Sequence, residues 1–174
     1  MKRLNLGCGN DIREGYINLD SANLPGVDVV WDLDHYPWPF EDCEFDEVIV
    51  IDVLEHLRDK IKPVEELWRI TKPDALIVVQ VPNWNTEDMW VDPTHRQPYT
   101  HRSFDFFDVA SAKTIDRGYL SHARFRVLGK IFSVVVFGRT VRLRNAIMRR
   151  PIAWLGTYLN SVLRTIVFEL RTVK

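Results

Sequence analysis

Residues 4–20 read LNLGCGNDIREGYINLD, and this stretch decides the fold. It predicts two short apolar strands, each followed at once by a small or acidic residue, and the pattern then recurs along the chain. The four predicted strands are residues 4–6, ending at Gly7-Cys8-Gly9, residues 16–19, ending at Asp20, residues 27–31, ending at Asp32, and residues 48–51, ending at Asp52.

The fourth strand and a fifth over residues 76–81 are nearly continuous runs of β-branched residues, which is typical of parallel strands buried on both faces. Between them, apolar residues at helical spacing predict a helical stretch over residues 54–71, with Asp52 and Glu55 as its N-terminal capping pair. A strand–helix–strand unit of this length is a right-handed crossover. The sequence therefore predicts an α/β fold with a mostly parallel twisted sheet and helices on both faces.

The second half of the chain predicts a long loop followed by mixed elements. Residues 83–102 are polar and aromatic without an apolar period, and loops of this length are usually functional or disordered. Residues 125–137 and 165–173 predict strands, and residues 141–163 predict a helical stretch. No apolar run reaches the roughly 20 residues that a membrane-spanning helix needs.

Charge is divided unevenly along the chain. Residues 1–112 hold 10 Lys+Arg against 22 Asp+Glu, whereas residues 113–174 hold 13 against 2. The arginines of residues 139–150 precede an amphipathic stretch over residues 152–159, which leaves three readings open: a membrane surface, an oligomer interface, or an ordinary packed helix. An anionic partner would explain the basic third, and so would neutralisation between the two halves of one domain.

The strand-end residues indicate the chemistry of the site. In an open parallel sheet, ligands bind beyond the carboxyl ends of the strands, and glycines there let a ligand approach the backbone closely. Asp20 can accept both hydroxyl protons of a ribose diol, and Asp32 can accept from an adenine amino group. Each feature alone is also common in turns and helix caps, but the series of four indicates a nucleoside-type ligand.

Several segments together resemble the compact class I S-adenosylmethionine-dependent methyltransferases of the methyltransferase type 11 kind. They are LGCG (6–9), GYINLD (15–20), WDL (31–33), FDEV (45–48), LEHL (54–57), RITKP (69–73) and DPTH (92–95) with Ser103-Phe104. The resemblance implies S-adenosylmethionine as cofactor and a seven-stranded, Rossmann-like sheet. Only ten residues lie between Gly9 and Asp20, too few for the helix that most class I methyltransferases have there.

Carried over position by position, the resemblance implies a full set of cofactor contacts. Gly7, Cys8, Gly9 and Asn10 would lie at the methionine part, Asp20 at the ribose, Asp32 and Leu33 at the adenine, and Ile51 and Asp52 near the sulfonium. It also implies one methyltransferase domain over residues 1–174. In that domain, residues 4–82 would be the cofactor-binding core, and residues 83–174 would supply the acceptor-side loop, helices and terminal antiparallel strands.

Three polar residues outside this set are candidates for catalysis: His56, Asp92 and His95. His56 lies close after the fourth strand, where it can contact the acceptor or act as a base, or can be simply a packed or capping histidine. Asp92, His95 and His101 fall in the long loop, and their spacing matches no known ligand pattern, so no metal site is predicted. The loop also carries aromatic residues that can stack on a sugar ring or pin the loop to the core: Trp84, Trp90 and Tyr99.

The sequence thus predicts methyl transfer to a small-molecule or sugar (glycan) acceptor, against two rival functions. A nicotinamide-dependent oxidoreductase would need Gly-x-Gly-x-x-Gly opening a long helix, but position 12 is isoleucine. A non-catalytic S-adenosylmethionine-binding or scaffold protein would carry the same strand-end residues. Cys8 and Cys43 form no metal-type or disulfide pattern, which suits a reducing cytoplasm. Peripheral membrane contact and the oligomeric state stay open.

Overall fold

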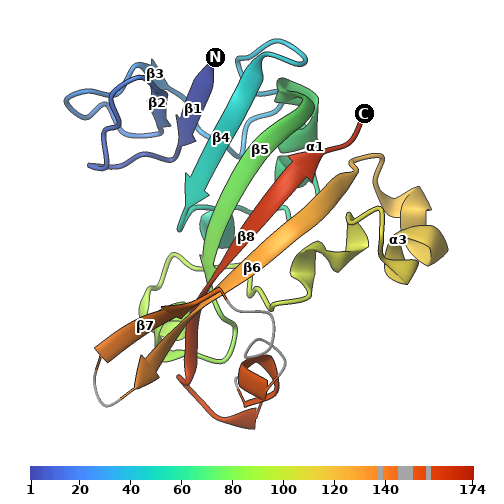
Figure 1. Ribbon diagram of the computed structural model, residues 1–174. Coiled ribbons are helices and arrows are strands. Elements are labelled where there is room, and N and C mark those ends of the chain that lie inside the picture. Colours follow the sequence, from blue (N-terminus) through green and yellow to red (C-terminus); the bar gives the residue numbers. More distant parts are fainter. Residues whose placement is uncertain (137–138, 145–150, 156–157) are drawn as a thin grey trace.

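A mixed sheet of eight strands organises the chain in the computed structural model, which describes residues 1–136, 139–144, 151–155 and 158–174 (Figure 1). The strands are β1 (Arg3–Leu6), β2 (Ile17–Asp20), β3 (Val29–Val30), β4 (Phe45–Ile51), β5 (Thr71–Pro82), β6 (Phe125–Val136), β7 (Arg139–Leu143) and β8 (Leu163–Thr172). Their order across the sheet is β3-β2-β1-β4-β5-β8-β6-β7. The first five in this order are parallel to one another, and β8, β6 and β7 pair antiparallel.

The α/β, Rossmann-like fold is confirmed, and the sheet has one strand more than the predicted seven in the part of the chain that the structure describes. The additional strand is β7, which forms a hairpin with β6 in which Val134 lies opposite Val141. The predicted helix over residues 141–163 is therefore wrong at its start, because Val141 and Leu143 alternate with polar residues at the two-residue period of a strand. Residues 145–150 and 156–157 lie outside the described residues.

Short helical segments connect the strands. They include η1 (Leu54–His56), α1 (Lys62–Ile70), α2 (Glu87–Val91), η2 (Ser103–Phe106), α3 (Ala112–Arg117) and η3 (Gly118–Leu120). Residues 151–155, within the predicted helical stretch, are also helical. The buried face of α1, with Val64 and Leu67, belongs to the same hydrophobic core as β1, β4 and β5. Glu66 on this helix accepts a 2.6 Å hydrogen bond from the backbone N–H of Trp38, so α1 also fixes the segment between β3 and β4.

The connection between β4 and η1 differs from the predicted capping box. Asp52 has a positive φ of +52°, and its carboxylate accepts a 2.9 Å hydrogen bond from the side chain of Gln80 on the neighbouring strand. The residue that precedes η1 is Val53, and no side chain caps it. Asp52 is thus turned away from the helix and toward the sheet edge, so the capping pair with Glu55 is wrong.

The connection between β1 and β2 contains no helix, as its length predicts. Asn18 on β2, only 4% exposed, holds this connection together instead. Its side-chain oxygen accepts from Nδ2 of Asn5 at 3.0 Å and from the backbone N–H of Arg13 at 2.9 Å. Its own backbone N–H donates to Asp28 at 2.8 Å. One buried amide therefore joins β1, the turn and the approach to β3.

Candidate functional site

Residues that follow the carboxyl ends of four parallel strands line a cavity of about 330 Å³. Five of the nine predicted cofactor residues line it: Gly7, Asp20, Asp32, Leu33 and Asp52. The other four lie at the same strand ends but outside the lining: Cys8, Gly9, Asn10 and Ile51. The predicted catalytic candidate His56 also lines the cavity. The structure therefore brings residues from β1, β2, β3 and β4 to one place, as strand-end positions in a parallel sheet require.

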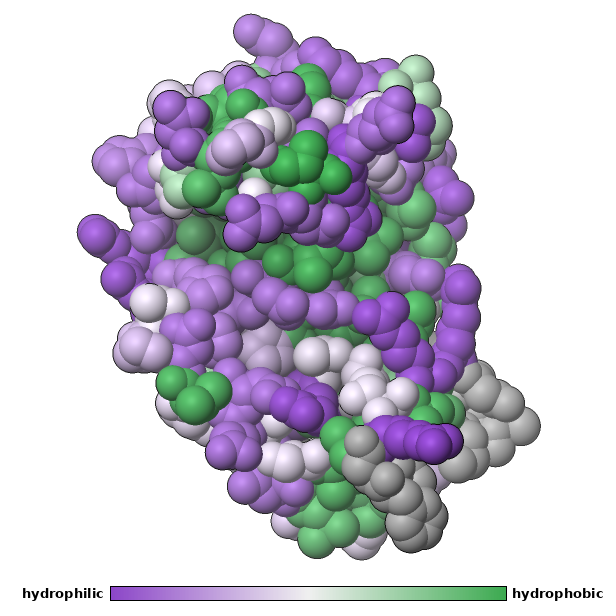
Figure 2. Space-filling view, turned by 90° about the vertical axis from the view of Figure 1, so that its left-hand side faces the viewer, coloured by the Kyte–Doolittle hydropathy of each residue, from purple (hydrophilic) through white to green (hydrophobic). Residues whose placement is uncertain are grey.

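Four lining residues were not predicted from the sequence: Ser21, Asp34, Val53 and Leu57. Ser21, Asp34 and Val53 lie within two residues of a predicted strand-end residue, so extending every strand end by two residues would have found them. Leu57 lies further along the chain and is adjacent to the predicted His56. Val53 and Leu57, together with Leu33, add apolar surface to a cavity that is also lined by aspartates. Figure 2 views the side of the molecule that carries β1 to β3, where hydrophilic residues dominate and hydrophobic ones show through between them.

Gly7 and Gly9 shape the first strand end. Both have a positive φ, +67° for Gly7 and +49° for Gly9, a conformation that glycine adopts without steric cost. A Cβ on Gly7 would lie 2.4 Å from Cγ2 of Val53, whereas one on Gly9 would meet nothing within 4 Å. The absence of a side chain at Gly7 is thus what lets the turn after β4 pack closely against the turn after β1.

The acids at the next two strand ends are oriented by backbone donors. The carboxylate of Asp20 accepts from the backbone N–H of Gly9 at 2.7 Å through one oxygen and from that of Ala22 at 2.9 Å through the other. Asp32 accepts from the backbone N–H of Asp34 at 2.9 Å. A carboxylate has about four acceptor positions, so both side chains keep capacity for the hydroxyl or amino groups of a ligand.

A chain of hydrogen bonds fixes His56 at the other end of the cavity. The hydroxyl of Thr94 donates to Oδ1 of Asp92 at 2.6 Å. Nδ1 of His56 lies 2.9 Å from the same hydroxyl oxygen, which is therefore free only to accept, so His56 is protonated on Nδ1 and leaves Nε2 with a lone pair. Burial and the neighbouring His95 lower the pKa of His56, which favours the neutral ring.

His95 lies against His56, with ring centroids 4.7 Å apart. Its Nδ1 is 3.1 Å from the backbone carbonyl of Met89. A carbonyl can only accept, so this nitrogen carries the proton and Nε2 is again the free nitrogen. The structure thus brings the three predicted catalytic candidates, His56, Asp92 and His95, into one cluster beside the cavity.

The long loop reaches this cluster because Glu55 anchors it. The backbone carbonyl of Glu55 accepts from the backbone N–H groups of Arg96 and Gln97, at 2.7 and 2.9 Å. The Glu55 side chain is fully buried, and in the described part of the chain neither carboxyl oxygen has a hydrogen-bond partner. Burial raises the pKa of this carboxyl to about 8, and the nearby Asp52 adds to the shift. Burial also raises the pKa of Asp52 itself.

His101 does not join the cluster. Its ring packs against Phe132 on β6, with centroids 6.4 Å apart. Burial lowers the pKa of His101, and the nearby Lys130 adds to the effect. Of the loop tryptophans, Trp90 is 67% exposed and donates from Nε1 to the carbonyl of Trp84 at 3.0 Å, so the two stabilise the loop from outside the core.

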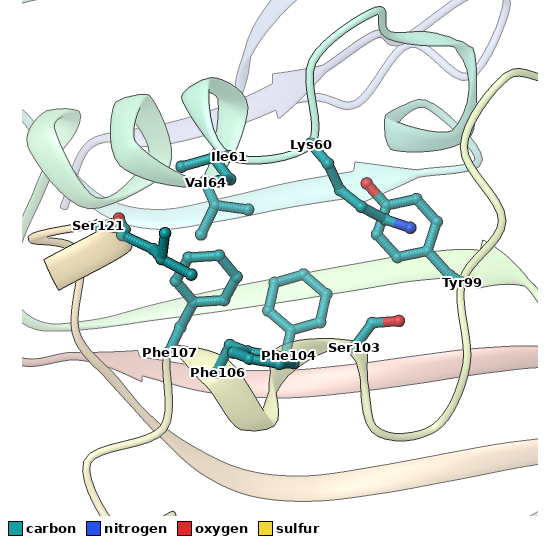
Figure 3. A pocket seen from close by; sticks show the side chains of 10 residues that line it. Lys60, Ile61, Val64, Tyr99, Ser103, Phe104, Phe106, Phe107 and Ser121 are labelled. Atoms are coloured by element: carbon teal, nitrogen blue, oxygen red, sulfur yellow. The ribbon is translucent and has the colours of Figure 1, made fainter. Parts of the chain in front are cut away.

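A second cavity, of about 310 Å³, lies between α1 and the segment that carries η2 (Figure 3). Rings dominate its lining, with Phe104 and Phe107 opposite Val64 of α1. The ammonium of Lys60 lies over the ring of Tyr99, 4.5 Å from its centroid. This cavity shares no lining residue with the strand-end cavity and offers none of its acids.

Comparison with known proteins shows what these features resemble. Residues 4–79 match the family model of a methyltransferase domain. No curated protein matches the chain.

Among solved structures, a methyltransferase dependent on S-adenosylmethionine from Archaeoglobus fulgidus is 16% identical, with a TM-score of 0.59 over 98% of this chain and 86% of that one. A putative sarcosine dimethylglycine methyltransferase from Galdieria sulphuraria is 13% identical, with a TM-score of 0.61 over 99% of this chain and 78% of that one. A structure of the Haloferax volcanii Trm112 methyltransferase activator with a putative methyltransferase matches at 16% identity, with a TM-score of 0.59 over 99% and 83%. At these identities the solved structures show a shared fold.

The helices in the described residues include none with the length and apolar character needed to cross a membrane. The family match spans β1 to most of β5 and therefore contains every residue that lines the strand-end cavity. Residues 4–79 therefore resemble a methyltransferase domain, and the chain shares its fold with S-adenosylmethionine-dependent methyltransferases.

Proposed function

We propose that the protein transfers a methyl group from S-adenosylmethionine to a hydroxyl oxygen of a small-molecule or sugar acceptor, at the strand-end cavity. One observation carries the proposal. Three aspartates from three strand ends line the same cavity as His56, whose Nδ1 is held by Thr94. This combination offers acceptors for a nucleoside at one end and a group that can act on a hydroxyl at the other.

The chain's own residues fit an adenosyl group. Asp20 keeps free acceptor positions on both oxygens for a ribose diol, and Asp32 does the same for an amino group. Leu33 supplies an apolar wall for the base, while Gly7, Cys8, Gly9 and Asn10 would follow the methionine part. Ile51 and Asp52 would lie nearest the sulfonium, whose positive charge suits the Asp52 carboxylate. The bound cofactor supplies an electrophilic methyl group.

The acceptor would lie between this cavity and the loop of residues 83–102. As the acceptor oxygen forms the new bond to the methyl carbon, the bond between that carbon and the sulfonium sulfur would break and S-adenosylhomocysteine would leave. The hydroxyl proton would pass to a free Nε2 lone pair of His56 or His95. Asp92 and Thr94 hold the His56 ring at Nδ1, which keeps Nε2 directed to the acceptor side. Much of the acceleration would come from positioning the hydroxyl in line with the sulfonium.

Two measurements test this function separately. Calorimetric titration with S-adenosylhomocysteine should show micromolar binding, about −8 kcal/mol, and no comparable binding of NAD. Incubation with methyl-labelled S-adenosylmethionine and a panel of hydroxylated small molecules and sugars should transfer label. Cofactor binding without transfer to any acceptor would support the alternative of a non-catalytic S-adenosylmethionine-binding or scaffold protein. Absence of cofactor binding would contradict the proposed site itself.

A further inference from the structure

The buried carboxyl of Glu55 has no hydrogen-bond partner among the residues that the structure describes. The side chain is 0% exposed, and both of its oxygens lack a hydrogen bond. Leaving a buried polar group unpaired costs roughly 1–3 kcal/mol, and more for a charged group. A polar side chain that is buried in this way indicates a missing partner.

Two histidines lie beside this carboxyl in the orientation that metal ligands have. One potential ligand atom from each of Glu55, His56 and His95 lies within 4.8 Å of the other two. Each histidine gives its Nδ1–H to an oxygen, His56 to the hydroxyl of Thr94 and His95 to the carbonyl of Met89. Histidines that bind metals usually donate their second nitrogen to an oxygen in this manner, which leaves the first nitrogen for the ion.

Outer contacts hold this arrangement in place. Thr94 donates in turn to Asp92, and Oδ2 of Asp92 lies 3.8 Å from Nε2 of His95. The backbone carbonyl of Glu55 accepts from Arg96 and Gln97 and so keeps η1 against the loop that carries His95. A cation bound at about 2.0–2.2 Å from each ligand needs ligand atoms about 3–4 Å apart, and the three ligand atoms already lie within 4.8 Å of one another.

From these contacts we propose that Glu55, His56 and His95 bind one divalent first-row cation, of the Zn²⁺ or Mn²⁺ class, at the acceptor side of the strand-end cavity. Two imidazoles and one carboxylate suit this class of ion and leave coordination positions open. The cation supplies the partner that the Glu55 oxygens lack. Its position next to His56, which lines the cavity, places the open coordination positions toward the acceptor.

The role of the cation rests on the proposed function. An acceptor hydroxyl bound to it becomes more acidic, because the ion stabilises the alkoxide. The hydroxyl proton then leaves to solvent, and the alkoxide oxygen attacks the methyl carbon. With the cation bound, the two ring nitrogens are ligands, and direct proton transfer to a ring nitrogen remains the slower route of the metal-free protein.

Metal binding can be measured without an acceptor. After treatment with a chelator and its removal, the full chain should bind one equivalent of Zn²⁺ or Mn²⁺ in calorimetry, and bound Co²⁺ should give visible absorption bands. Glu55→Gln and His95→Gln should each weaken binding by about 100-fold or more, and Thr94→Val, which removes an outer contact, by about 10–100-fold. His122→Gln serves as the matched control, since His122 is exposed and pairs with Glu65 away from the cluster.

A thermal readout covers the case in which Glu55→Gln folds poorly. Zn²⁺ should raise the Tm of the wild-type protein and of His122→Gln, but not that of His95→Gln. No stoichiometric binding, or binding that Glu55→Gln and His95→Gln leave unchanged, would overturn the metal site. Titration with S-adenosylhomocysteine on the same samples separates the two proposals, since loss of the cation should leave cofactor affinity within about twofold.

Discussion

The backbone N–H of Gly9 donates a 2.7 Å hydrogen bond to Oδ2 of Asp20, across the turn that joins β1 to β2. The other carboxylate oxygen is held by the backbone N–H of Ala22. The side chain proposed for the ribose is therefore fixed before a ligand arrives, which lowers the ordering cost of binding. The same two bonds fix the turn, so Asp20 connects local backbone structure with the proposed cofactor site.

Replacing Asp20 should weaken cofactor binding more than it weakens the fold. Asp20→Ala should cost about 2–3 kcal/mol of S-adenosylhomocysteine affinity, because charge-assisted bonds to the ribose hydroxyls are lost. Asp20→Asn, which keeps an acceptor for the Gly9 N–H, should lose less. Asp42→Ala is a suitable control, because Asp42 is exposed and pairs with Arg69 outside the cavity. Calorimetry checks the affinities, and wild-type affinity in a folded Asp20→Ala protein would place the cofactor elsewhere.

Gly7→Ala should destabilise the protein by about 2–4 kcal/mol, because a Cβ at a positive φ would also press on Val53. Gly9→Ala should cost only about 1–2 kcal/mol, since it has the same sign of φ but open space around it. Combining Gly7→Ala with Val53→Ala should recover part of the loss. Urea unfolding of the wild type, Gly7→Ala, Val53→Ala and the double variant measures the coupling between the two residues, and Gly9→Ala is measured beside them. Equal costs at the two glycines would contradict the steric explanation.

The loop of residues 83–102 should affect methyl transfer without affecting cofactor binding. His95→Ala and Trp90→Ala should each reduce transfer by about tenfold or more, because the loop is proposed to hold the acceptor. Thr94→Val should lower the rate as well, and Thr94→Ser, which keeps the hydroxyl bonded to His56, should restore it. His122→Ala is the control for loss of a histidine. Full activity of both His95→Ala and Trp90→Ala on the true acceptor would remove the loop from the site.

Asp46 gives a prediction on pH. The backbone N–H of Lys2 and the ammonium of Lys72 hold the pKa of its carboxyl below the ordinary value of 3.8. A lowered folded-state pKa adds stability above the ordinary value, and this stability is lost as the pH falls through the folded-state pKa. Wild type should therefore exceed Asp46→Asn in unfolding free energy at pH 7, and the difference should shrink as the pH falls below the ordinary pKa of 3.8. Urea unfolding over a series of pH values checks it, and a constant difference would contradict this origin.

The basic third of the chain should bind anionic surfaces in a salt-dependent way. Arg139 and Arg142 on β7 are exposed, and in the described part of the chain no ion pair joins them to an acid, whereas Arg144 pairs with Glu169 at 2.9 Å. Arg149 and Arg150 lie outside the described residues. We expect co-sedimentation with anionic vesicles at low salt, reduced at high salt and in the double variant Arg139→Gln, Arg142→Gln. A protein that ignores anionic vesicles at both salt concentrations would leave these arginines as surface charge alone.

The parts of the molecule that sequence predicts well are those set by local pattern. Continuous β-branched runs predict β4 and β5, and a glycine or aspartate after each strand predicts which residues line the cavity, because parallel strands end at one edge. Asp20 and Asp32 were predicted to line the cavity from their position after a strand alone. The hairpin partner of β6 was missed, because the alternation of Val141 and Leu143 with polar residues is too short to identify a strand by itself. Its pairing with β6, which the sequence does not show, completes the assignment.

The acceptor side was less predictable because it depends on contacts distant in sequence. The Asp52–Glu55 pattern looks like a capping box, but Gln80 on β5 draws the Asp52 carboxylate toward the sheet edge. Glu55 and His95 come together because the backbone carbonyl of Glu55 accepts a hydrogen bond from the backbone N–H of Arg96 in the loop. No spacing rule predicts a ligand set built from one turn after β4 and a loop after β5.

The buried Asn18 that replaces a helix between β1 and β2 has a consequence for the order of folding. Hydrogen bonds such as those from Asn18 to Asn5 and Asp28 fix the arrangement of these segments but contribute little to the free energy of folding. The apolar strands β4 and β5 should therefore become protected first, and β2 with β3 should dock onto them late and open most readily. Amide exchange should be faster in β2 than in β4. A nucleoside bound at Asp20 should slow exchange in β2, so cofactor binding would stabilise the least stable edge of the sheet.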